Sequence, residues 1–257
     1  SLMAVQIRNR LQQALGMPLS ATVAFDYPTV DRLSAHLLAD VLAQPQPTLS
    51  QAVTAAAVDE PIAIIGAACR FPGSADDPEA YFQLLLEGGI AVSDVPESRW
   101  RSADYYDPSP ETPGRSYVCK AGFLRQVEDF DPAFFRISPR EAETLDPQQR
   151  LLLEVSWEAL EHAGQDATRL RESATGVFVG VGPNEYAERV EGLSAEQASP
   201  YGATGTAVSF TAGRVSFVLG LHGPSLAVDT ACSSSLVALH LACQSLRLRE
   251  CEQALAG

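Results

Sequence analysis

The chain has 257 residues, of which 46% are hydrophobic, enough to build one large domain or two smaller ones around packed cores. Its formal net charge of −14 disfavours nucleic-acid binding, because phosphate groups are bound by clustered Lys and Arg. No apolar run approaches the roughly 20 residues of a membrane span, and no secretory leader pattern is visible, so we expect a cytoplasmic protein that binds no membrane.

The cysteines are five in number, and no two of them form a Cys-x-x-Cys pair. They are Cys69, Cys119, Cys232, Cys243 and Cys251. Disulfide frameworks use an even number of cysteines, and structural zinc sites use closely spaced pairs. We therefore expect reduced thiols, no disulfide framework and no metal site.

Residues 1–43 have the pattern of a small helical unit. Apolar residues recur at nearly helical spacing at Leu2, Val5, Leu11 and Leu15. Gly16 is of the type that ends a helix, and a loop is predicted at 25–28. Thr29 is of the type that caps a helix start, and the apolar stripe that follows it predicts a second helix over 30–41.

From residue 44 to residue 58 the composition shifts to Pro, Gln, Ala, Ser and Thr. Such a composition is typical of an extended tether between domains. We therefore predict a linker at 44–58 and a second domain over 59–257.

Short apolar runs and longer amphipathic stretches alternate in this second domain. Buried strands are predicted at 61–66, 176–181 and 225–228. Helices are predicted at 78–87, 146–163, 207–219 and 233–248. This alternation indicates a mainly parallel α/β sheet covered by helices. The stretch 92–135, which is rich in Pro, Asp, Tyr and Arg, is predicted to be a long ordered surface excursion.

Cys232 lies where the strand predicted at 225–228 turns through small residues into the helix predicted at 233–248. Backbone N–H groups at a helix start stabilise a thiolate and also the oxyanion of a reacting thioester. These features favour a nucleophile. The residues alone leave a second interpretation open, in which Cys232 is a small apolar core residue.

The sequence around Cys232, Asp229-Thr230-Ala231-Cys232-Ser233-Ser234-Ser235-Leu236, resembles the active-site signature of β-ketoacyl synthases, especially those of modular type I polyketide synthases. Further matching stretches occur upstream in the order that the family shows. They are Glu60 to Gly66, Cys69 to Gly73, and Asp146 to Glu154. The resemblance covers residues 59–257 and identifies Cys232 as the family's nucleophile.

The resemblance implies the N-terminal half of a thiolase-like, layered αβαβα fold. It also implies a decarboxylative Claisen condensation, in which an acyl group on Cys232 is joined to a malonyl-type unit on an acyl carrier protein. The family's two catalytic histidines and its lysine belong to the second half of the domain. We therefore expect a truncated domain that is inactive by itself, with His36, His162, His222 and His240 structural or exposed.

The first eleven residues are similar to the helix that follows the modification site of acyl carrier proteins, and the stretch 25–30 fits the same family. On this alignment Ser1 is the serine that carries 4'-phosphopantetheine. An alternative is that Ser1 is an uninformative terminal residue. No nucleotide is expected, because the stretch 180–185 lacks the third glycine of a dinucleotide-binding loop.

The implied partners are acyl carrier domains that hold acyl and malonyl-type thioesters, other polyketide synthase domains, and a second copy of the ketosynthase in a homodimer. Two rival functions stay open at this point. One is a ketosynthase-like domain that gates or decarboxylates without condensing. The other is a non-catalytic scaffold fragment.

Overall fold

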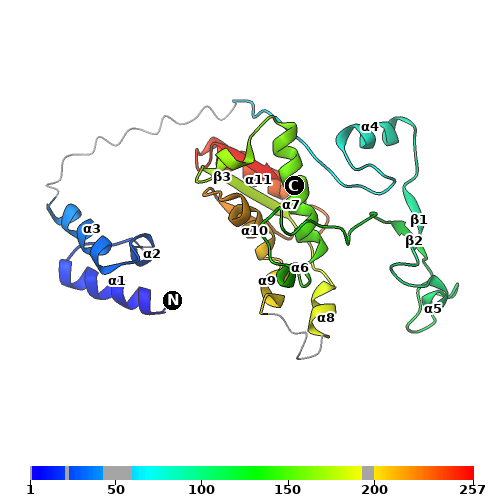
Figure 1. Ribbon diagram of the computed structural model, residues 1–257, viewed down its shortest axis with the longest axis horizontal. Helices are drawn as coiled ribbons and strands as arrows, with labels where there is room; N and C mark the ends of the chain where they lie inside the picture. Colours follow the sequence, from blue (N-terminus) through cyan, green and yellow to red (C-terminus); the bar gives the residue numbers. More distant parts are fainter. Residues whose placement is uncertain (1, 21–22, 43–59, 193–199) are drawn as a thin grey trace. The chain divides into compact units, whose positions relative to one another are not determined.

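The computed structural model describes residues 2–20, 23–42, 60–192 and 200–257, and the chain divides into two compact units, Ser1–Ala55 and Ala56–Gly257 (Figure 1). The linker predicted at 44–58 lies outside the described residues. Each unit is considered by itself below.

The described part of the first unit is helical. It contains α1 (Leu2–Leu15), α2 (Val23–Asp26) and α3 (Val30–Leu42). Gly16 ends α1 with a positive φ of 66°, and its N–H donates to the Gln12 carbonyl. Thr29 caps α3 as predicted, because its Oγ1 accepts the Arg32 N–H at 3.3 Å.

The loop predicted at 25–28 is wrong in its first half, because α2 extends through Asp26. A hydrogen bond from the Tyr27 N–H to the Val23 carbonyl closes this turn, and the Val23 side chain is buried. Burial of one apolar residue therefore stabilises a short helix whose sequence favours a loop. His36 stacks on the Tyr27 ring with 4.0 Å between ring centroids.

A parallel sheet with the strand order β4-β3-β5 forms the centre of the described part of the second unit. The strands are β3 (Thr175–Gly180), β4 (Ser225–Val228) and β5 (Gln253–Ala256). The strands predicted at 176–181 and 225–228 are confirmed. Val177 lies opposite Ser225 on one side of β3 and opposite Leu255 on the other. Both hydrogen-bonding edges of β3 are therefore occupied.

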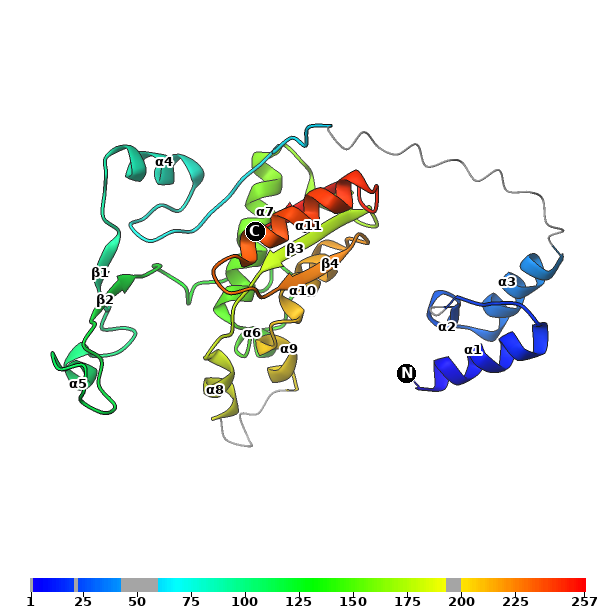
Figure 2. The same ribbon diagram turned by 180° about the vertical axis from the view of Figure 1, so that it is seen from behind.

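Helices cover both faces of this sheet, as Figure 2 shows with α11 in front of the strands and α7 and α10 behind them. These helices are α7 (Pro147–His162), α10 (Phe210–Leu219) and α11 (Ser234–Arg247). Val177 and Val179 pack in the larger core with α7 and α10, whereas Phe178 packs with Ala238 and Ala242 of α11. The alternating sides of β3 therefore belong to two cores, and both are apolar because parallel strands are covered on both faces.

The helix ends follow local capping chemistry, and all four predicted helices form within a few residues of their expected bounds. The fourth is α4 (Pro78–Leu86), whose N-cap Asp77 accepts the Ala80 N–H. Asp146 caps α7 in the same way, with proline as the first helical residue. Gly220 ends α10 in the left-handed region, at φ 70°.

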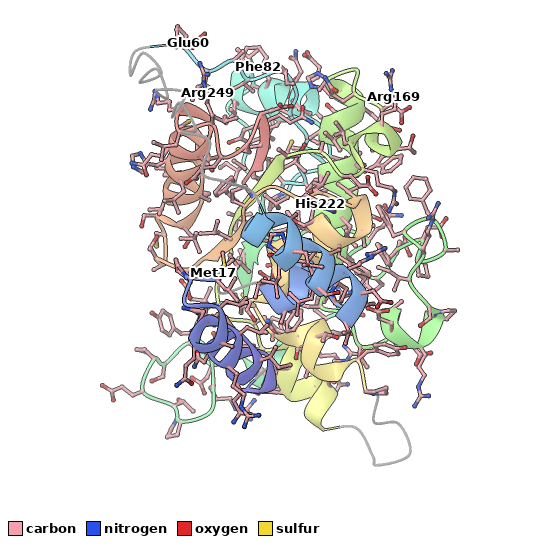
Figure 3. The ribbon with its side chains drawn as sticks, turned by 90° about the vertical axis from the view of Figure 1, so that its left-hand side faces the viewer. Met17, Glu60, Phe82, Arg169, His222 and Arg249 are labelled. Atoms are coloured by element: carbon pink, nitrogen blue, oxygen red, sulfur yellow. The ribbon has the colours of Figure 1, made fainter. Side chains whose placement is uncertain are left out.

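The excursion predicted at 92–135 is ordered and contains a two-stranded antiparallel ribbon. The ribbon pairs β1 (Val92–Asp94) with β2 (Lys120–Gly122), and α5 (Ser102–Tyr105) lies between them in the chain. The preceding α4 presents apolar side chains to solvent, including Phe82, which is 54% exposed and labelled in Figure 3. Shorter elements complete the described fold: α6 (Pro139–Ala142), η1 (Ala167–Leu170), α8 (Tyr186–Glu191) and α9 (Gly202–Thr206).

The strand predicted at 61–66 is not formed. Ile64 is 84% exposed, and the segment runs along an apolar groove of about 1020 Å³ that is also lined by α7, α11, β3 and β5. Both edges of β3 are paired, with β4 and β5, and 61–66 forms no ladder with the outer edge of either of those strands. The sequence pattern missed β5, because Glu252 and Gln253 interrupt its apolar run.

A partly buried network of polar side chains joins α6, α7, α9 and α10. Arg214 of α10 donates to Glu141 of α6 at 2.6 Å and to Gln149 Oε1 of α7 at 2.7 Å. The Gln149 amide donates in turn to the Gly205 carbonyl of α9 at 3.0 Å. Each polar side chain of this network thus has a partner, which offsets the cost of removing it in part from water. Within the described ranges, no helix is both long and apolar enough to cross a membrane.

Asp146 differs from this network because one of its carboxylate oxygens is buried without a hydrogen-bond partner among the described residues. Its Oδ1 accepts the Gln148 N–H at 2.7 Å, whereas Oδ2 is the orphan. Burial raises the pKa of Asp146 above the ordinary 3.8, and the bond from Gln148 offsets only part of that rise. The charged form of this side chain therefore costs stability in the folded state.

Replacing Gly180 by Ala should destabilise the second unit by about 1–3 kcal/mol, because the added Cβ would lie 2.5 Å from the backbone nitrogen of Ser235 in α11. The free energy of unfolding from urea denaturation measures this effect. Gly213→Ala is the matched control. Gly213 lies on the exposed face of α10, and a Cβ added there would have no heavy atom within 4 Å. It should be neutral or stabilising by about 0.5–1 kcal/mol. Equal effects of the two substitutions would contradict the close packing at Gly180.

The raised pKa of Asp146 predicts a stability that falls as pH rises above 3.8, because the folded state retains the proton to higher pH than the unfolded state does. Asp146→Asn removes this dependence, so the stability of the variant relative to the wild type should increase with pH.

Asp166 is the opposite case, because hydrogen bonds from Thr168 lower its pKa. Asp166→Asn should therefore lose stability relative to the wild type as pH rises. Denaturation curves at several pH values measure both slopes. Slopes of the same sign would contradict the assignment.

Candidate functional site

The predicted nucleophile, Cys232, lies exposed in the turn that joins β4 to α11. The chain leaves β4 at Val228 and α11 begins at Ser234, so the reversal takes five residues. Ala231, directly before Cys232, has a φ of 54°. This left-handed conformation is costly for a residue with a Cβ and requires support from its surroundings.

Side-chain hydrogen bonds to the backbone supply that support. Asp229 Oδ1 accepts the Ala231 N–H at 3.0 Å. Ser234 Oγ accepts the Thr230 N–H at 2.8 Å and donates to the Ala231 carbonyl at 2.7 Å. Ser233 Oγ donates to the Thr230 carbonyl at 2.9 Å. The backbone on both sides of Cys232 is therefore fixed while its side chain stays open to solvent.

The N-terminal end of α11 lies two residues after Cys232 and is held close to the sheet at Gly180. A Cβ on Gly180 would lie 2.6 Å from the Ser234 carbonyl carbon, so only glycine permits this approach of helix and strand. α11 has 14 residues and no acidic residue in its first turn. The positive end of its dipole thus favours negative charge in front of it, as a thiolate or an oxyanion requires.

The other residues considered from the sequence lie elsewhere. Cys243 is half-buried within α11, and Cys251 is buried beside Phe178. Burial, together with Asp77, raises the pKa of the Cys69 thiol, which opposes thiolate formation there. Ser1 lies outside the described residues. Over the described ranges, no group of three or more His, Cys, Asp and Glu is placed to hold a metal ion.

The histidines of the second unit serve other contacts or face solvent. His162 Nδ1 accepts the Ala67 N–H at 3.0 Å. The backbone N–H of His222 donates to the Ser173 carbonyl at 2.9 Å, and His240 is exposed on α11. Within the described part of this unit, no histidine forms a hydrogen bond with the turn at Cys232.

The sequence pattern assigned no role to Ser234 or Gly180, although both shape this turn. The one available signal was the small residue at each position, at a strand end in the case of Gly180 and two residues after Cys232 in the case of Ser234. Small residues at such places indicate close backbone approach. Which of three consecutive serines faces inward depends on the helix rotation, and the sequence does not give that.

Two family descriptions match the chain. Residues 59–257 match the β-ketoacyl synthase N-terminal domain, and residues 1–37 match the phosphopantetheine attachment site. The polyketide synthase GfsB of Streptomyces halstedii is 50% identical over 258 residues, covering all of this chain and 5% of that protein. The mycoketide-CoA synthase of Mycobacterium tuberculosis is 48% identical over 258 residues, covering all of this chain and 6% of that protein.

Solved structures show the same fold. The oxazolomycin ketosynthase domain OzmH KS7 of Streptomyces albus is 43% identical with a TM-score of 0.67, over 75% of this chain and 34% of that chain. The ketosynthase from module 6 of the bacillaene synthase of Bacillus subtilis is 38% identical with a TM-score of 0.64, over 76% and 30% respectively. The predicted thiolase-like α/β fold is thereby confirmed. The chain spans a small part of the length of these proteins. It belongs to the β-ketoacyl synthase family of modular polyketide synthases, with a phosphopantetheine attachment domain ahead of the ketosynthase N-terminal domain.

Proposed function

We propose that Cys232 is the nucleophile of a ketosynthase that extends a polyketide chain by decarboxylative condensation. The observation that carries this proposal is the exposed thiol at a fixed strand-to-helix turn, in front of the N-terminus of α11. Of the five cysteines, this one combines exposure with a helix start, and it lies within the region that matches the family.

The proposed first step loads an acyl group onto the enzyme. The Cys232 thiolate attacks the carbonyl carbon of an acyl thioester, a C–S bond forms at Sγ, and the C–S bond to the donor thiol breaks. The donor thiol leaves with the proton that Cys232 has lost. Negative charge on the carbonyl oxygen faces the positive end of α11, where it is stabilised.

The proposed second step uses a malonyl-type thioester, which loses carbon dioxide to give a carbanion. The carbanion attacks the acyl carbon, a carbon–carbon bond forms, and Sγ leaves as the thiolate. The family's histidines and lysine would assist decarboxylation, and the histidines of the second unit described above are bound or exposed elsewhere. The intact protein is therefore the appropriate one for every test of turnover.

We also propose that Ser1 carries 4'-phosphopantetheine, which supplies a thiol that holds acyl groups as thioesters. Its support is the match of residues 1–37 to the attachment-site family and the helix α1 that begins at the next residue, Leu2. Domain limits of 1–43, 44–58 and 59–257 are part of the same proposal.

The proposed partners are carrier domains with acyl and malonyl-type thioesters, and a second ketosynthase in a homodimer. β4 lies at one edge of the sheet, and Leu226 on this strand is 40% exposed. Phe217 on the neighbouring α10 is also exposed. An unpaired strand edge beside exposed apolar side chains favours pairing with another chain. The cytoplasmic location stays a prediction.

Cys232 should be alkylated by iodoacetamide at least about tenfold faster than Cys243, because a helix start stabilises a thiolate and a half-buried position within the helix does not. Peptide mass spectrometry of the intact protein measures both rates. Cys232→Ala should abolish acylation by an acyl thioester, whereas Cys243→Ala should leave it intact. Equal alkylation rates, or acylation that persists in Cys232→Ala, would contradict the nucleophile. Acylation without any carbon–carbon bond formation would indicate the non-condensing alternative.

A phosphopantetheinyl transferase with coenzyme A should add the mass of the phosphopantetheine arm to the intact protein at Ser1. Ser1→Ala should show no added mass, because the hydroxyl that forms the phosphodiester is gone. Ser34→Ala is the control, since this serine lies exposed in α3 and its hydroxyl donates to the Asp31 carbonyl. Modification that survives Ser1→Ala would overturn the assignment.

A further inference from the structure

The turn at Cys232 contains one buried hydroxyl among residues that are otherwise exposed. Ser233 and Ser235 are exposed, whereas Ser234 between them is 7% exposed. Ser234 lies against β3 at Gly180, where the absence of a side chain leaves room for it. Three chemically identical neighbours therefore occupy different environments, and only Ser234 is turned into the protein.

The Ser234 hydroxyl spans the residues on the N-terminal side of Cys232. It accepts the Thr230 N–H at 2.8 Å and donates to the Ala231 carbonyl at 2.7 Å. The Ser234 backbone N–H donates to the same Ala231 carbonyl at 3.1 Å. One residue of α11 thus holds the peptide groups on both sides of the one that joins Thr230 to Ala231, directly before the thiol.

The peptide groups that it holds are the ones that need support. Ala231 has a left-handed φ of 54°, which residues with a Cβ adopt only under constraint. The other side chain bonded to Ala231, Asp229, is exposed, so water competes for its hydrogen bond. The Ser234 hydroxyl is buried, so its two hydrogen bonds are better shielded from that competition.

We propose that Ser234 is a positioning residue for Cys232: its hydroxyl fixes the left-handed conformation of Ala231, and this conformation directs the thiol into the open side of the turn. The role rests on the proposed function, in which Cys232 is the nucleophile. Ser234 itself touches no reacting atom. Its contribution is orientation, to which acyl transfer is sensitive because misplacement of a reacting group lowers the rate steeply.

The test is the acylation of Cys232 in the intact protein by an acyl-N-acetylcysteamine thioester, followed by mass spectrometry as a function of thioester concentration. Ser234→Ala should lower the acylation rate at saturating thioester by about tenfold or more and leave the half-saturating concentration unchanged. Ser234→Thr retains the hydroxyl and should restore most of the rate. Ser235→Ala is the matched control, because it removes an exposed hydroxyl one position away, and it should behave as the wild type.

The two ideas fail in different ways. No acylation of Cys232 in the wild type would overturn the proposed function. A wild type that is acylated normally, with Ser234→Ala acylated at the same saturating rate, would overturn the positioning role. Iodoacetamide labelling of buried Cys251 reports unfolding of the same unit in each variant. If Ser234→Ala unfolds by this measure, Ser234→Thr decides: a folded protein with a rate reduced tenfold would also overturn the role.

Discussion

The close approach of α11 to β3 at Gly180 is the constraint on which the candidate site depends. A side chain at this position would overlap the backbone of Ser234 and Ser235, so glycine alone lets the first turn of the helix rest on the end of the strand. That contact determines how α11 is rotated and therefore which of its residues face the sheet. It also sets how tightly the chain must reverse between β4 and α11, and Cys232 lies in that reversal.

A tight reversal requires an unusual backbone, and the turn meets this need with short polar side chains. Ala231 adopts the left-handed region while Asp229, Ser233 and Ser234 bond the peptide groups around it. Local strain at a turn of this kind persists only where neighbouring structure holds it. The result is a thiol that is exposed and fixed at the same time, close to the positive end of a helix, which are the properties that nucleophilic catalysis requires.

The larger fold follows from β3, whose two faces and two edges are all used. Val177 and Val179 on one face and Phe178 on the other anchor separate cores, and β4 and β5 occupy its edges. The segment 61–66 has a strand-like sequence but lies outside the sheet, although the outer edges of β4 and β5 have no strand partner among the described residues. Its exposed Ile64 borders an apolar groove instead. An apolar run is therefore not sufficient for strand pairing, because pairing depends on contacts with distant residues that a residue pattern does not encode.

Sequence patterns predicted the helices α4, α7, α10 and α11, the strands β3 and β4, the cap at Thr29, and, through its motif, Cys232 as the candidate nucleophile. These features depend on residue periodicity, capping side chains and neighbouring residues, all of which are local. Only tertiary contacts account for the pairing of β5 with β3, the exclusion of 61–66 from the sheet, and the burial of Ser234 between two exposed serines. Those features depend on contacts between residues 54 to 78 positions apart, such as Gly180 with Ser234 and Thr175 with Gln253, which form only when the whole unit is folded.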